Sequence, residues 1–95
     1  MKTLHLDPPH LEMVREILRP YHQNFYAFGS RTKGTHRPLS DLDIVSRAPL
    51  SKIQVSEINE KFEESNLSFK VDLILWSEID EAFKEKISPD LLPVF

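Results

Sequence analysis

The hydrophobic positions of the chain follow helical spacing in some segments and strand-type patterns in others. Apolar residues three and four positions apart predict helices that begin at Pro8, Ser51 and Ser77. Short apolar runs with aromatic and β-branched residues predict strands. These predicted strands cover residues 24–28, 41–46 and 68–76.

The last two predicted elements need separate comment. Ser77 is expected to begin the final helix, with Asp80 three positions on in a variant of the capping box. Pro89 and Pro93 then end regular structure and leave a tail, residues 91–95, in which four of five residues are apolar. Such a tail either packs back on the domain or binds a partner, and we expect partner binding.

The alternation of helices and strands predicts an α/β fold in one domain, residues 1–95, with a small sheet of three or four strands flanked by about four helices. The link between the first two strands holds a glycine-bearing loop and a short helix that starts near Ser30. This link is too short for a full crossover helix. The first two strands are therefore expected to be antiparallel, and the sheet mixed.

Composition argues against several classes of function. The 95 residues carry a formal net charge of −3, which argues against nucleic-acid binding through a basic face. No apolar run approaches the roughly 20 residues of a membrane span, and the first ten residues do not resemble a secretory signal. The absence of cysteine fits a cytoplasmic location.

Three aspartates carry the candidate chemistry. Asp41 and Asp43 are two positions apart on a predicted strand, so both side chains point to one face, ~6.6 Å apart along the strand. Asp72 interrupts the most apolar strand, where a carboxylate is costly unless it is paired or binds metal. If the two strands are neighbours, the carboxylates form one cluster that a divalent cation neutralises. An isolated Asp-x-Asp pair is also explained by a solvated strand edge, and the alternative for Asp72 is an exposed position on a one-sided strand.

The two glycines of the chain lie in one loop, at positions 29 and 34. Backbone N–H groups where this loop opens a helix suit phosphate, which Gly29 allows to approach closely and to which the Ser30 hydroxyl can donate. The loop is not a Walker A motif, because Thr35-His36 stands where Lys-Ser/Thr is needed.

Three further residues are candidate nucleotide contacts, Arg31, Lys33 and Ser40. Arg31 offers charge-assisted hydrogen bonds to phosphate, as does Lys33, although a solvated position explains either side chain as well. Ser40 directly precedes the acidic pair, where capping or orienting the loop is its expected role. Gly34 is explained equally well as the end of a helical turn.

The pair Gly29-Ser30, followed by the run Ser40-Asp41-Leu42-Asp43-Ile44, resembles the signature of the nucleotidyltransferase superfamily that includes DNA polymerase beta and kanamycin nucleotidyltransferase. The longer run GSRTKGTHRPLSDLDI is similar to the minimal nucleotidyltransferases, which are short bacterial and archaeal proteins. The order and length of the elements also match, so the resemblance covers nearly the whole chain.

The resemblance implies a role for each residue. Gly29 and Ser30 would hold the triphosphate of ATP. Asp41 and Asp43 would coordinate Mg²⁺, and a site of this type commonly holds two ions. Asp72 would be the third carboxylate, which helps to bind the catalytic metal and deprotonates the acceptor hydroxyl.

The resemblance also implies a partner. Minimal nucleotidyltransferases are commonly the antitoxin half of a pair with a HEPN-domain toxin, an RNase, and transfer AMP from ATP to a tyrosine hydroxyl of that toxin. Because the chain ends after the fourth predicted helix, a partner is expected to supply part of the acceptor surface. Two alternatives stay open, namely an antitoxin that blocks the toxin by binding alone, and nucleotide transfer to a small molecule, for which a homodimer supplies the second surface. Transfer to RNA ends fits poorly with the acidic balance.

Overall fold

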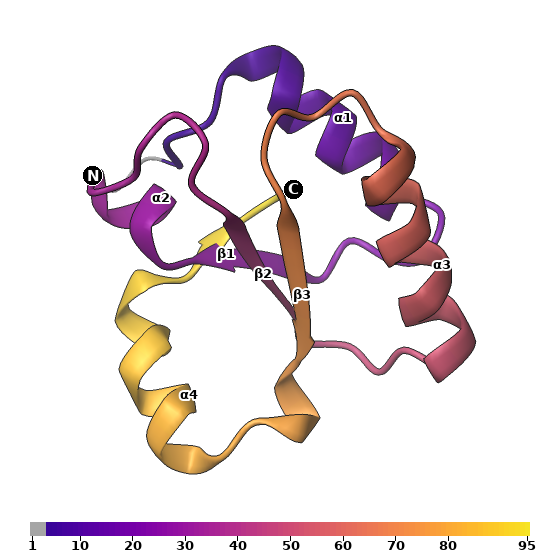
Figure 1. Ribbon diagram of the computed structural model, residues 1–95. Helices are drawn as coiled ribbons and strands as arrows, with labels where there is room; N and C mark the ends of the chain where they lie inside the picture. Colours follow the sequence, from indigo (N-terminus) through magenta and orange to yellow (C-terminus); the bar gives the residue numbers. More distant parts are fainter. Residues whose placement is uncertain (1–3) are drawn as a thin grey trace.

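The computed structural model describes residues 4–95, in which helices and strands follow the expected order (Figure 1). The helices are α1 (Pro8–Leu18), α2 (Ser30–Lys33), α3 (Lys52–Glu64) and α4 (Glu81–Ile87), with 3-10 turns η1 (Trp76–Glu78) and η2 (Ser88–Asp90). The strands are β1 (Phe25–Phe28), β2 (Leu42–Ser46), β3 (Val71–Leu75) and β4 (Leu92–Pro93). The expectation about a secretory signal falls partly on residues 1–3, outside the described residues. Among residues 4–95, no helix has both the length and the apolar character needed to cross a membrane.

The four strands form one mixed sheet in the order β3-β2-β1-β4. β1 is antiparallel to both β2 and β4. Its pairing with β2 is antiparallel because the link between these two strands holds only the short helix α2 and a loop. The longer connection through α3 returns the chain to the same end, so β3 is parallel to β2. The expected fold class, a mixed α/β sheet with helices, is confirmed.

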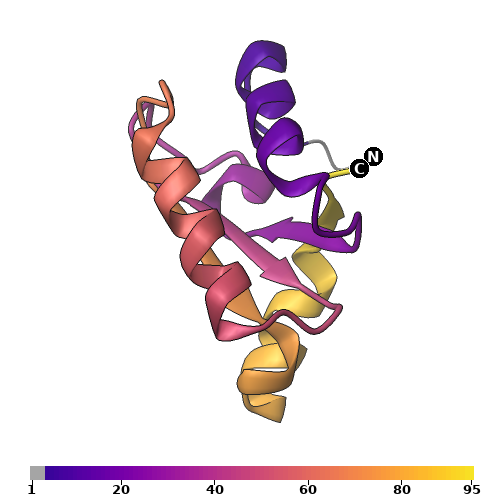
Figure 2. The ribbon, with the colours of Figure 1, turned by 90° about the vertical axis from the view of Figure 1, so that its right-hand side faces the viewer.

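The helices divide between the two faces of the sheet (Figures 1 and 2). α1 and α3 contact each other and cover the larger core, in which residues of every second strand position are buried, including Ala27, Ile44 and Val71. α4 packs against the other face, over Phe28 and Val45. Because α4 has only seven residues, part of this second face is left accessible.

Side-chain caps mark the first turns of α3 and α4. α3 begins with a complete capping box, in which Ser51 and Gln54 each accept a hydrogen bond from the other's backbone N–H. The last helix begins at Glu81, so the expected start at Ser77 is wrong. Ile79 is extended (φ −97°, ψ 149°) and packs into the core beneath α4. Asp80 is therefore the N-cap, and its carboxylate accepts from the Phe83 N–H at 2.7 Å.

The apolar tail packs on the domain, so the expectation that it binds a partner is wrong. Leu92 and Pro93 pair with β1 as strand β4, and the Val94 N–H donates to the Phe25 carbonyl at 3.0 Å. The Val94 carbonyl in turn accepts from Arg15 Nε at 2.7 Å. The Val94 side chain is 1% exposed. The edge of β1 needs a hydrogen-bonding partner, and the tail provides it.

We predict that Val94→Ala lowers the free energy of unfolding by about 2 kcal/mol, because it removes two buried methyl groups and leaves a cavity. Urea denaturation measures this change. The control is Leu39→Ala, at a side chain 70% exposed, for which a change within about 0.5 kcal/mol is expected. Equal effects of the two substitutions would contradict the packing of the tail.

Candidate active site

The pairing of β2 with β3 brings two of the three aspartates together. Asp43 and Asp72 are directly opposed residues in this parallel pair. Their neighbours Ile44 and Leu73 face the core under α1 and α3, so both carboxylates point to the other face, which α4 covers only in part. The expected juxtaposition of strand acids is therefore present for this pair.

Asp41 lies one residue before β2 and is exposed. It is near enough to act on Asp43 electrostatically. The pKa of Asp43 is raised, first by partial burial and then by the negative charges of Asp72 and Asp41. The negative charges of Asp41 and Asp72, together with burial, thus disfavour the charged form of Asp43.

Asp72 has a counter-ion of its own. Lys70 Nζ lies 3.4 Å from Asp72 Oδ1, and the Asp72 side chain is 42% exposed. β3 is an edge strand of the sheet, and this position explains why a carboxylate is tolerated within an apolar sequence. Asp72 is therefore accessible from solvent, at the margin of the sheet.

The donor set suits a hard divalent cation. Among residues 4–95, no three acidic or histidine side chains converge as a preformed metal site. Mg²⁺, however, needs only one or two carboxylates and takes its other ligands from water and substrate phosphates. The neighbouring carboxylates of Asp43 and Asp72 meet that need. Burial, together with the negative charges of Asp72 and Asp41, raises the pKa of Asp43. The residues therefore fit Mg²⁺.

Gly29 lies against this acidic pair, between β1 and α2. Its backbone (φ 86°, ψ −154°) is in a region that is essentially restricted to glycine. A Cβ atom at this position would lie 2.6 Å from Asp43 Oδ2. The expectation that glycine permits close approach of a phosphate stays a prediction. The structure adds a second reason for glycine that the sequence does not reveal, namely that the Asp43 carboxylate lies against the Gly29 backbone.

The short helix α2 fixes the loop after Gly29. Ser30 begins this helix, and Thr32 closes its first turn, with both its N–H and its hydroxyl donating to the Gly29 carbonyl at 3.0 and 2.8 Å. Thr32 is buried and was missed, although a threonine three residues after a turn glycine is a recognisable signal. Gly34 is left-handed (φ 76°, ψ 12°) and caps the helix.

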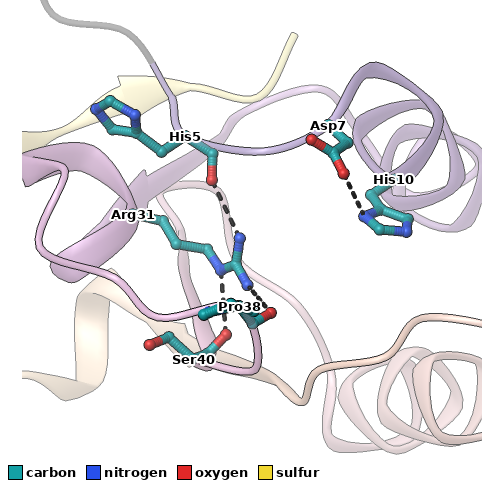
Figure 3. Close-up of polar contacts among 6 residues, drawn as sticks. All are labelled: His5, Asp7, His10, Arg31, Pro38 and Ser40. Atoms are coloured by element: carbon teal, nitrogen blue, oxygen red, sulfur yellow. Dashed lines mark hydrogen bonds and ion pairs between the residues drawn. The ribbon is translucent and has the colours of Figure 1, made fainter.

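Arg31 does not extend toward a phosphate, contrary to expectation. Its side chain is 5% exposed and stacks on Phe69, with Cζ 4.3 Å from the ring centroid. Figure 3 shows its guanidinium donating to three backbone carbonyls, those of His5 (3.1 Å), Pro38 (3.2 Å) and Ser40 (3.1 Å). Three of the five N–H donors of Arg31 thus bond to backbone carbonyls, and Arg31 ties the N-terminal segment to the acidic loop.

Ser40 completes the same arrangement. Its hydroxyl accepts from the Arg37 N–H at 2.7 Å while its carbonyl accepts from Arg31. The residue after it is Asp41. Ser40 thus orients the loop that carries the acids, as its position in the sequence indicated.

Two cavities meet at this site, an acidic one and one lined by two lysines and the carboxylate of Asp90. The larger, about 710 Å³, is lined by Asp43 and Asp72 together with apolar side chains. The smaller, about 220 Å³, is lined by Gly29, Lys33 and Lys86, among others. Phe28 and Phe83 line both cavities, and their rings contact each other edge to face at 6.0 Å.

Comparisons with known proteins bear on the family of this chain. The sequence profile of the family described as "Nucleotidyltransferase domain" matches residues 10–92. The chain is 40% identical over 81 residues to the "Probable protein adenylyltransferase MntA" of Haemophilus influenzae, a match that covers 81% of this chain and 71% of that protein.

A solved structure shares the fold. It is described as "Crystal structure of the toxin-antitoxin with AMP-PNP", and it superposes with a TM-score of 0.68 at 23% identity, over 90% of this chain and 72% of that one. The family match spans most of the sequence and includes the Gly29-Ser30 turn and all three aspartates. The chain therefore belongs to the nucleotidyltransferase domain family.

Proposed function

We propose that this nucleotidyltransferase uses Mg²⁺ to transfer AMP from ATP to a hydroxyl group of a protein, a tyrosine of a HEPN-class toxin, and so acts as an antitoxin. The observation that carries the proposal is the packing of the Gly29 backbone against Asp43, with Asp72 directly beside it. This places a turn suited to phosphate next to carboxylates suited to Mg²⁺.

The relatives support the finer parts of the proposal. The Haemophilus influenzae protein is described as a probable protein adenylyltransferase, which supports AMP as the transferred group and a protein as the acceptor. The solved structure is described as a toxin–antitoxin with AMP-PNP, an ATP analogue, which supports a nucleotide donor and a toxin partner. The HEPN class and the tyrosine acceptor follow from the resemblance to minimal nucleotidyltransferases.

The residues of the chain would act as follows. The Gly29 backbone and the Ser30 hydroxyl bind and orient the phosphates of ATP. Asp41, Asp43 and Asp72 would hold Mg²⁺, which would neutralise the charge that develops on the phosphoryl oxygens. Asp72, accessible at the sheet edge, accepts the proton of the acceptor hydroxyl. The acceptor oxygen bonds to the α-phosphorus, the bond to the β-phosphate breaks, and pyrophosphate leaves with that electron pair.

We expect the purified protein to label a HEPN-class toxin when the two are incubated with α-labelled ATP and Mg²⁺. The double variant Asp41→Ala/Asp43→Ala should lose at least about 100-fold of the rate, because charge stabilisation in the transition state is lost. Glu60→Ala, at an exposed carboxylate on α3, is the matched control and should transfer at the wild-type rate. Equal transfer by the double variant would refute the proposal. Neutralisation of the toxin in cells by the folded double variant would point instead to an antitoxin that acts by binding.

A second prediction concerns the contact between Gly29 and Asp43. Gly29→Ala should cost about 1–3 kcal/mol of stability from its backbone angles and should also reduce transfer, because the new Cβ displaces the Asp43 carboxylate. The stability cost should be smaller when Asp43→Ala is present, since the contact atom is then absent. Gly34→Ala, at the other positive-φ glycine, is the control and should show no such coupling to Asp43. An additive double-mutant cycle for Gly29 would contradict this explanation.

A third prediction concerns the effect of the Asp43 charge on the stability of the fold. The raised pKa of Asp43 means that its charged form destabilises the folded state at neutral pH. In EDTA, Asp43→Asn should therefore have a higher midpoint temperature of thermal unfolding than the wild type. Mg²⁺ with a non-hydrolysable ATP analogue should reverse this order by stabilising only the wild type. A metal-free Asp43→Asn variant that is less stable than the wild type would contradict the electrostatic account.

A further inference from the structure

We propose that the free edge of β3 binds the acceptor protein by strand addition, pairing with an extended, positively charged segment that carries the hydroxyl group to be modified. This inference rests on the proposed function and adds to it the way in which the acceptor is recognised. The proposed reaction uses only the side chain of Asp72 from this strand, and the inference gives the strand backbone a role as well.

The backbone of β3 has hydrogen-bonding groups that the sheet leaves unpaired. Among residues 4–95, only β2 pairs with this strand. The Leu42 N–H donates to the Lys70 carbonyl at 2.9 Å. Because the backbone groups of successive strand residues point to opposite sides, every second residue from Lys70 faces β2 and the residues between them face outward. The outward-facing residues are Val71, Leu73 and Leu75.

The outer edge of β3 is accessible from both faces of the sheet. Two cavities, of about 480 and 500 Å³, lie between α3 and β3, and the acidic cavity of about 710 Å³ lies on the face of Asp43 and Asp72. Leu73, in the middle of the outward-facing row, lines all three cavities. The side chains of an added strand alternate between the two faces, so they find space on each.

An added strand would bring an acceptor residue beside Asp72. Neighbouring strands lie about 4.8 Å apart, and directly opposed residues point to the same face of the sheet. The residue opposite Asp72, or its diagonal neighbour, therefore points to the face that carries the acidic pair. An aromatic side chain spans such a separation, so a tyrosine hydroxyl can reach the carboxylate that would accept its proton. The residues on either side of the tyrosine then point to the cavities beside α3.

The charge along this edge favours a basic segment. Five carboxylates and two lysines line the three cavities. The acids are Asp43, Glu63, Asp72, Glu78 and Asp80, and the bases are Lys52 and Lys70. ATP with bound Mg²⁺ carries a net negative charge of its own, so donor binding does not reverse this excess. A cationic segment is therefore attracted to the edge and held in register by it.

The same charges disfavour a second copy of this chain as the added strand. Two copies that paired their outward-facing groups would place both Asp72 side chains on one face, together with the acids around them. Like charges in such a cross-strand arrangement are destabilising. The acceptor protein, and not a second copy, is thus the occupant that the edge suits.

Amide hydrogen exchange, resolved by residue with NMR, tests the pairing directly. In the free protein, the N–H groups of Asp72 and Ile74 should exchange slowly because they bond to β2, and those of Leu73 and Leu75 should exchange at least about 100-fold faster. Addition of the HEPN-class toxin without nucleotide, so that no transfer occurs, should slow Leu73 and Leu75 at least about tenfold. Unchanged exchange at both residues in a complex that still forms would overturn the inference. Slow exchange in the free protein that strengthens with protein concentration would also overturn it, because a second copy would then occupy the edge.

A backbone variant provides a second test. Leu75→Pro removes one outward N–H without removing a bond to β2, and proline is tolerated at such edge positions. It should raise the KM for the toxin about tenfold, the effect of one lost backbone hydrogen bond with its partner left unpaired. The KM for ATP should change less than about twofold. Leu75→Val keeps the N–H and is the matched control, with a toxin KM within about twofold of the wild type.

A charge variant tests the basic character of the segment and does not depend on the folding of Leu75→Pro. Glu63→Lys/Glu78→Lys should raise the KM for the toxin about tenfold and leave kcat nearly unchanged, because charges that flank the edge attract the segment without taking part in the reaction. Glu16→Lys/Glu85→Lys, at exposed acids on α1 and α4, makes the same change in net charge and should have less than about a twofold effect. Equal effects of the two double variants would overturn the inference, since the attraction would then be general.

These outcomes separate the inference from the proposed function. If Leu75→Pro and Glu63→Lys/Glu78→Lys label the toxin with wild-type KM, the inference is wrong and the proposed function stands. If the wild type neither binds nor labels the toxin, the proposed function is wrong and the inference falls with it. Circular dichroism and thermal unfolding of each variant distinguish these results from loss of folding.

Discussion

Crowding of negative charge at one end of the sheet governs the rest of this site. Asp43 is partly buried beside Asp72 and within the field of Asp41, and its raised pKa records the resulting cost. The strand pairing that causes this crowding is the pairing that builds the core, since Ile44 and Leu73 pack on the opposite face of the same residue pairs. The fold therefore holds the carboxylates together, and a bound cation would offset their mutual repulsion.

The sequence was sufficient for the order of the elements, and the brevity of the link between β1 and β2 made that strand pair antiparallel. Asp41 lies one residue before β2, so the strand face that we expected Asp41 and Asp43 to share stays a prediction. The direct opposition of Asp43 and Asp72 was beyond the sequence, because it depends on the register between strands joined through α3. Register is fixed by packing of the whole face, which no local pattern contains.

The incorrect expectations have a common origin in tertiary contacts. Arg31 has the residue type and the position of a phosphate ligand, but the carbonyls of His5, Pro38 and Ser40 surround its guanidinium. The tail has the composition of a binding segment, but the unpaired edge of β1 takes it up. The helix start at Ser77 fits the local pattern, but burial of Ile79 moves it to Asp80. In each case a distant segment supplied the partner that decided the outcome.

The position of β3 at the sheet margin has a consequence for the kind of acceptor that suits this domain. β4 closes the β1 side, whereas Asp72 lies on the strand at the opposite margin and is open to solvent. A reaction centre at such a margin has little enclosure of its own, so water reaches it freely and weakens every charge interaction there. A large, folded acceptor that lies across this margin would act as the missing wall, so that docking of the acceptor and drying of the reaction centre become one event.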